Sequence, residues 1–298
     1  MASQLPGMGQ VFRLGQTNMS GEIDWTDAFD NGGYIEGAAD YPPLWARSAA
    51  AFRETLEPTP CARLDLRYGD HERERFDLFL PQDEPAGLLV FVHGGYWLKF
   101  DKSTWSHLAA GSLSRGWAVA MPSYPLAPEA RVSEITRSVA RAVTEAAAHV
   151  SGPIRLAGHS AGGHLVCRML CAGVLPDSVA KRLAGAVSIS GLHQLRPLVA
   201  AAMNEKLRLT PEEAHAESPA CLEPSHGVPL IAWVGAKERP EFLRQTRLIE
   251  EVWCRTGADV AAHYDPGHHH FSVIAALAEP DTSLTHAVLT GALPAPAR

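Results

Sequence analysis

The chain has 298 residues, a hydrophobic content of 46% and a formal net charge of -7 at pH 7. This length and apolar content allow one large α/β domain with a sizeable core, whereas the lack of a Lys- and Arg-rich block argues against a nucleic-acid partner. The five cysteines form no CxxC pair and are odd in number, which favours reduced thiols.

The N-terminal residues 1–25 lack the basic start and the continuous apolar run of a signal peptide. No later run reaches the roughly 20 apolar residues that a membrane-spanning helix requires. The sequence therefore predicts a cytoplasmic protein without a membrane partner, and it leaves both a monomer and a homodimer open.

Helical and strand-like segments alternate from residue 41 onward. Residues 41–56 begin with prolines and continue with helix formers, which predicts a helix. Residues 75–81 alternate like a half-buried strand that could pair antiparallel at a sheet edge. Short apolar runs typical of buried parallel strands follow at 88–92, 118–121, 154–157, 184–189, 230–234 and 260–264. Helical periodicity lies between them at 132–150, 162–175 and 240–256.

This alternation predicts an α/β fold with a mostly parallel sheet and helices on both faces, formed as a single domain over residues 1–298. The polar segment 194–228 interrupts the alternation. A segment of this length can form a lid or a pocket wall, or it can be a solvated surface excursion.

A serine flanked by glycines, in Gly158-His-Ser-Ala-Gly162, follows the run at 154–157 and precedes a helical segment. This is the pattern of a nucleophile elbow, in which a sharp strand-to-helix turn exposes the serine oxygen. The N-terminus of the following helix favours negative charge that develops beside it. The pattern therefore predicts Ser160 as a catalytic nucleophile.

A serine hydroxyl is a weak nucleophile, so Ser160 needs a base and an acid that orients the base. In the chain order of this elbow, the acid should follow the run at 230–234. Glu238 is the only carboxylate in that loop before the next helix, and Glu241 and Asp259 are the alternatives.

The base should lie after the last strand, where His268, His269 and His270 are consecutive. The chain order leaves all three open and favours His270, which stands at the entrance of a helix. A triple histidine also raises the question of a metal. Consecutive side chains seldom converge on one ion, and no Cys, Asp or Glu completes a site at the usual spacings, so neither a metal nor a cofactor is expected.

The tetrahedral intermediate of acyl transfer needs backbone N–H donors for its oxyanion. Ala161, the residue after the nucleophile, supplies one donor. The loop after the run at 88–92 begins His93-Gly-Gly, and its glycines let the backbone approach a substrate. His93 itself is expected to turn inward and hydrogen-bond the loop.

Together these motifs resemble the kynurenine formamidases (arylformamidases) of the α/β-hydrolase fold and their esterase-like relatives, from about residue 41 onward. The motifs are His93-Gly-Gly-Tyr-Trp97, Asp101-Lys102, Tyr124-Pro-Leu-Ala-Pro128, Gly158-His-Ser-Ala-Gly-Gly-His164, Arg196-Pro-Leu198, Ser218-Pro219, Pro240-Glu-Phe242, Arg244-Gln245 and His270-Phe271.

The resemblance implies a catalytic triad. Its acid stands two residues before the PEF proline, at Glu238, where members of the family commonly carry Asp. Its histidine directly precedes Phe271, which selects His270. The HGGxW loop and the elbow imply oxyanion donors at Gly94, Gly95 and Ala161.

The resemblance also implies a small-molecule substrate. It points to hydrolysis of the formyl amide of N-formyl-L-kynurenine or a related aryl formamide without a metal, and cleavage of small acyl esters is the alternative. Tyr96, Trp97 and the segment 194–228 are expected to bind the substrate. Lys99, Lys102 and Arg196 are candidates for contacting a substrate carboxylate, each weighed against a solvated or structural charge.

Overall fold

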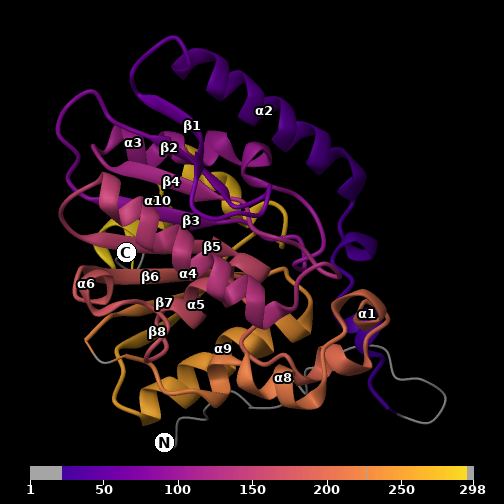
Figure 1. Cartoon of the computed structure of the whole chain (residues 1–298). Coiled ribbons are helices and arrows are strands. Elements are labelled where there is room, and N and C mark those ends of the chain that lie inside the picture. The colour runs from indigo at the N-terminus through magenta and orange to yellow at the C-terminus, as the bar shows by residue number, and fades with distance from the viewer. Residues whose placement is uncertain (1–21, 226, 294–298) are drawn as a thin grey trace, which may run out of the picture.

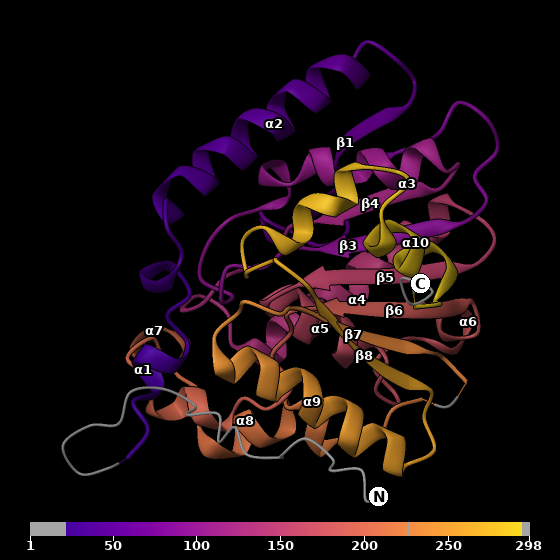
Figure 2. The same ribbon diagram turned by 180° about the vertical axis from the view of Figure 1, so that it is seen from behind.

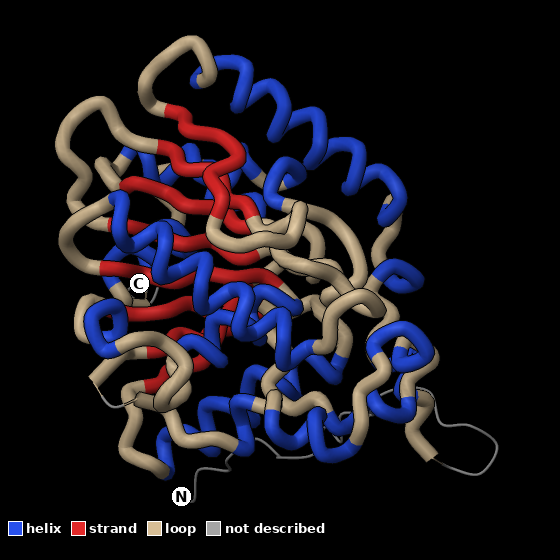
Figure 3. The backbone as a smooth tube through the Cα atoms, viewed as in Figure 1, coloured by secondary structure: helices blue, strands red, loops and turns tan. Residues whose placement is uncertain are grey.

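An eight-stranded sheet forms the centre of the molecule, in the order β1-β2-β4-β3-β5-β6-β7-β8 (Figures 1 and 3). The computed structural model describes residues 22–225 and 227–293, so most of residues 1–25, for which no signal peptide is expected, lie outside the described residues. The strands are β1 Ala62–Arg67, β2 Arg75–Phe79, β3 Leu88–Val92, β4 Ala118–Pro122, β5 Ile154–His159, β6 Leu183–Ile189, β7 Leu230–Gly235 and β8 Val260–Asp265.

The sheet is mostly parallel, as predicted. Strand β2 is antiparallel to both β1 and β4, and every pair from β4 through β8 is parallel. The predicted edge position of residues 75–81 is wrong, because β1 occupies that edge and β2 lies inside it. Strand β1 was not predicted from the sequence: half of its residues, ARLDLR, are charged, and alternate positions along it are exposed.

Two layers of helices cover the sheet, one on each face (Figures 1 and 2). One layer contains α4 Val132–His149, α5 Ala161–Met169 and α9 Pro240–Arg255, and the other contains α2 Tyr41–Leu56, α3 Ala110–Ser114 and α10 Ser283–Thr290. The described chain also has short α-helices, α1 Trp25–Ala28, α6 Asp177–Ala180, α7 Asn204–Leu207 and α8 Pro211–Ala216, and several 3-10 turns. No helix among residues 22–225 and 227–293 is long and apolar enough to span a bilayer.

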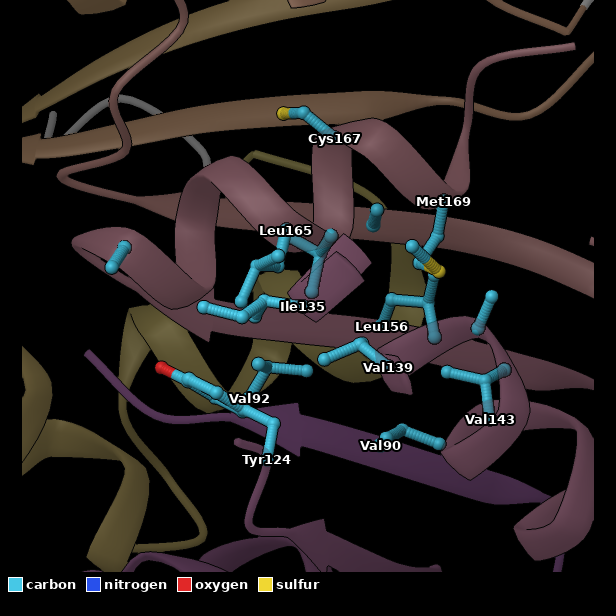
Figure 4. Close-up of a cluster of buried hydrophobic side chains, with 14 of the residues drawn as sticks. Val90, Val92, Tyr124, Ile135, Val139, Val143, Leu156, Leu165, Cys167 and Met169 are labelled. Atoms are coloured by element: carbon cyan, nitrogen blue, oxygen red, sulfur yellow. The ribbon is translucent and has the colours of Figure 1, made fainter. Parts of the chain in front are cut away.

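The interface between the sheet and the α4–α5 layer is a close-packed apolar core (Figure 4). Its side chains come from β3, β5, α4 and α5, and include Val90, Val92, Leu156, Ile135, Val139, Val143, Leu165, Cys167 and Met169. Full burial of one such aliphatic side chain contributes about 1.5–3 kcal/mol. This core holds β3 and β5 rigidly, and the loops that leave their carboxyl ends carry the candidate site.

Candidate active site

Ser160 lies on a sharp turn between β5 and α5. Its backbone has φ 57° and ψ −117°, a conformation that costs energy for a residue other than glycine and that persists at functional sites when the surroundings impose it. The turn is this tight because α5 approaches β3 closely: a Cβ on Gly162 would lie 1.9 Å from the carbonyl oxygen of Val92. Ser160 is 3% exposed and begins at a helix N-terminus.

His270 and Glu238 form a buried hydrogen-bonded pair. Nδ1 of His270 lies 2.6 Å from Oε2 of Glu238, and because a carboxylate only accepts, the imidazole donates its Nδ1 proton. Nε2 then carries the lone pair that a general base needs. The His270 ring is held between those of His159 and Phe242, at centroid distances of 4.6 and 4.5 Å.

The other candidates for acid and base make structural contacts. His268 contacts the hydroxyl of Ser272, and His269 lies 3.2 Å from the Tyr41 hydroxyl. Both oxygens of Glu241 accept hydrogen bonds from Arg244.

Asp259 is exposed and precedes β8, so it lies at the amino end of that strand, whereas His270 follows its carboxyl end. Asp259 therefore lies at the opposite end of the strand from His270 and cannot serve as the acid.

The loop after β3 packs directly against the elbow. A Cβ on Gly94 would lie 2.7 Å from the His159 carbonyl oxygen and 3.0 Å from Cβ of Ser160. Gly95 has φ 109°, which favours glycine, and α5 begins at Ala161, so the N–H of Ala161 belongs to a first helical turn without intrahelical acceptors. These backbone groups can therefore serve an oxyanion beside Ser160.

His93 fixes this loop from the inside. Its Nδ1 lies 2.7 Å from the carbonyl oxygen of Gly94, to which it donates, and its ring stacks on Tyr124 at 4.3 Å. Burial lowers the pKa of His93 to about 4, so the ring stays neutral. The inward orientation expected from the sequence is present.

Ser160 and His270 open into one cavity of about 340 Å³. Six aromatic side chains line it: Phe29, Trp45, Tyr96, Phe100, Trp105 and Phe271. The N-terminal segment 26–32 closes one side of it, a role that the sequence analysis missed. Asp24 caps α1, because its side chain accepts hydrogen bonds from the N–H groups of Thr26 and Asp27. This N-cap is the local sequence signal for an ordered segment.

The two aromatic residues expected to bind substrate have different positions. Tyr96 lines the cavity, and its hydroxyl donates to the carbonyl oxygen of Phe29 at 2.6 Å. Trp97 is fully buried and packs edge-on against His164 at 5.1 Å, so its expected role in contacting substrate needs correction. Consecutive positive φ angles of 53° and 58° at Tyr96 and Trp97 turn the tryptophan into the core.

The segment 194–228 contributes little to the cavity. Only Met203 from it is among the lining residues, within the described chain. The segment instead folds as short helices, including α7 and α8, beside the sheet. Five residues of the N-terminal segment 26–32 line the cavity, compared with this one from the segment 194–228.

Of the cationic candidates, Lys99 alone lines this cavity within the described residues. Lys102 is buried and paired with Asp65 and Asp77 at 2.9 and 2.7 Å, which makes it structural. Arg196 lines a separate groove with Trp25.

The described residues contain no group of three or more His, Cys, Asp or Glu side chains that could hold a metal ion. His268, His269 and His270 diverge toward different partners, as their contacts show.

A strained serine between a parallel strand and a helix, followed by an acid after β7 and a histidine after β8, defines the α/β-hydrolase class. A family model described as the alpha/beta hydrolase fold matches residues 89–229. Kynurenine formamidase from Salmo salar is 31% identical over 240 residues, covering 76% of this chain and 80% of that protein. The chain therefore belongs to the kynurenine formamidase family of α/β-hydrolases.

Two further proteins are similar to this chain. Kynurenine formamidase from Danio rerio is 30% identical over 237 residues, covering 76% of this chain and 80% of that protein. The crystal structure of a protein from Silicibacter sp. TM1040, provisionally assigned as a thioesterase, is 52% identical with a TM-score of 0.85, and the match covers 90% of this chain and 100% of that one.

Proposed function

We propose that the protein is a metal-independent serine hydrolase that cleaves the formyl amide of N-formyl-L-kynurenine or a related aryl formamide. The observation that carries the proposal is the Glu238–His270 pair behind a cavity that Ser160 lines. The names of the relatives from Salmo salar and Danio rerio support the formamide as substrate.

The residues have distinct roles in this reaction. Nε2 of His270 takes the Ser160 proton as Oγ attacks the formyl carbon, and Glu238 stabilises the imidazolium. The N–H groups of Gly94, Gly95 and Ala161 bind the oxyanion. Collapse of the intermediate breaks the C–N bond, the aryl amine takes the proton from His270, and a formyl ester remains on Ser160. Water, deprotonated by His270, attacks the formyl ester, and the C–O bond to Ser160 breaks as His270 returns the proton to Oγ and formate leaves.

The walls of the cavity suit the rest of this substrate. N-formyl-L-kynurenine has an aromatic ring, a carboxylate and an ammonium group. The aromatic walls can pack on the ring, and the charged lining residues are Lys99 and Asp30, of opposite sign. We assign Lys99 to the carboxylate and Asp30 to the ammonium group.

The first experiment compares kcat/KM for N-formyl-L-kynurenine with that for the matched acetamide. One methylene alone changes specificity by ~10–200-fold. Because the formyl carbonyl is also more electrophilic, the preference for the formamide should reach or exceed this range. Ser160→Ala should abolish turnover, and dialysis against a chelator should leave it unchanged. Near wild-type turnover by Ser160→Ala, or loss with the chelator, would contradict the serine mechanism.

The second experiment tests the charged walls. Lys99→Ala should raise KM for N-formyl-L-kynurenine about fivefold, the equivalent of ~1 kcal/mol for a partly exposed pair, and leave KM for an uncharged phenyl ester unchanged. Arg196→Ala, which removes the same charge from the separate groove, is the matched control. Equal effects of Lys99→Ala on both substrates would refute the assignment.

A second candidate function is hydrolysis of small acyl esters or thioesters. It is favoured by the 52% identity to the Silicibacter protein that is provisionally assigned as a thioesterase. The same triad would serve, because an ester or thioester leaving group needs less protonation than an amine. Efficient cleavage of short acyl esters or thioesters, with none of N-formyl-L-kynurenine, would establish this alternative.

A further inference from the structure

We propose that Ser190 is a positioning residue for the catalytic acid: its hydroxyl holds Glu238 in the orientation that serves His270. The inference rests on the triad of the proposed function, but it does not depend on which acyl substrate the triad attacks.

The contacts of the Glu238 carboxylate carry this inference. Ser190 is fully buried, and its hydroxyl donates to Oε1 of Glu238 at 2.5 Å. The N–H of Gly235 donates to the same oxygen at 3.0 Å. Oε2 is left for Nδ1 of His270, at 2.6 Å. The two carboxylate oxygens thus have separate tasks, one anchored to the protein and one aimed at the base.

The backbone of Ser190 connects this anchor to the nucleophile. Ser190 follows β6 with φ 53°, in the left-handed region that non-glycine residues rarely adopt. Its N–H donates to the carbonyl oxygen of Trp233 in β7 at 2.6 Å, and the carbonyl oxygen of the preceding Ile189 accepts the N–H of Ser160 at 2.8 Å. Strain of this kind persists where the surroundings impose it, and here the backbone hydrogen bond to β7 holds Ser190 with its hydroxyl on Glu238.

Glutamate makes such an anchor necessary. Its side chain has one more rotatable bond than aspartate, so the carboxylate has more orientations available. Two donors on Oε1, the Ser190 hydroxyl and the Gly235 N–H, select one of these orientations. Without the hydroxyl, the carboxylate can rotate away from Nδ1, and the imidazolium that forms during acyl transfer loses stabilisation.

The test uses Ser190→Ala and Ser190→Gly. Glycine accepts the left-handed backbone without strain, so it remains informative if the alanine variant folds poorly. The matched control is Ser188→Ala, which also removes a buried hydroxyl from this region, one that donates to Gly163 rather than to the acid. The measurement is the second-order rate at which an activated alkyl phosphonate modifies Ser160, followed against pH.

Both Ser190 variants should react about tenfold or more slowly, as expected for loss of a hydrogen bond to a charged group. The midpoint of their pH profile should fall, because a rotated carboxylate stabilises the imidazolium less. Ser188→Ala should match the wild type in both. In a Glu238→Gln background, Ser190→Ala should cause no further loss, because the hydroxyl acts through the carboxylate.

Wild-type rates and an unchanged profile in both Ser190 variants would overturn the inference, and so would full additivity with Glu238→Gln. Failure of the phosphonate to modify the wild-type protein would be a different result, because it would refute the proposed serine mechanism itself.

Discussion

At the residue scale, the proposed catalytic acid, Glu238, differs from the alternative Asp259 in burial and in contact with His270. Glu238 faces His270 from a buried position, whereas Asp259 is exposed at the amino end of β8. Glu238→Gln should lower kcat by about 10³–10⁴-fold, because an amide cannot stabilise the imidazolium or select its tautomer. Asp259→Asn should leave kcat unchanged. The measurement is kcat of both purified variants. A large loss in Asp259→Asn with none in Glu238→Gln would show that Glu238 is not the acid.

At the scale of elements, the site depends on how closely the loop after β3 approaches the elbow between β5 and α5. Alanine at position 94 would bring a methyl group within 2.7 Å of the His159 carbonyl oxygen, a distance that forces one of the two loops to move. We expect Gly94→Ala to lower kcat by about 10²-fold, comparable to the loss of one oxyanion donor.

The control for this prediction is Gly116→Ala. Gly116 lies in the turn before β4, and a Cβ there would meet no atom within 4 Å, although its φ of 76° also disfavours alanine. That variant should lose some stability and keep its kcat. Unchanged kcat in Gly94→Ala would show that the loop does not place the oxyanion donors.

At the scale of the whole molecule, buried neutral histidines make stability depend on pH. Burial lowers the pKa of His164 and of His193 to about 3, and that of His93 to about 4. In the unfolded chain these groups titrate near 6.5. As pH falls below 6.5 the unfolded state binds protons that the folded state does not, so stability is lost until the folded values are reached.

Each of these histidines should therefore lower the free energy of unfolding by about 1.4 kcal/mol per pH unit between pH 6 and 5. Urea unfolding at pH 7.5, 6 and 5 measures the slope. His164→Gln should reduce this slope by the contribution of one histidine, about 1.4 kcal/mol per pH unit. A stability that stays constant over this range would show that the folded and unfolded states bind the same number of protons, which contradicts neutral buried histidines.

Local sequence patterns determined the positions of most strands and of the serine turn. Apolar runs gave the positions of β3 to β8, and the glycines around Ser160 gave the elbow, because periodicity and turn chemistry act over a few residues. Chain order, together with the family resemblance, gave the acid and the base. The structure places Ser160 and His270 on one cavity and pairs His270 with Glu238, and their catalytic roles remain predictions.

Only the tertiary structure decided which distant segments meet at this site. Ser190 contacts Glu238 because β6 and β7 are adjacent in the sheet, and no pattern near Ser190 encodes that adjacency. The segment 26–32 lines the same cavity as Ser160, although more than a hundred residues of chain separate them. Trp97 points into the core rather than into this cavity. Strand order and packing fix these contacts, because they depend on the whole sheet rather than on neighbouring residues.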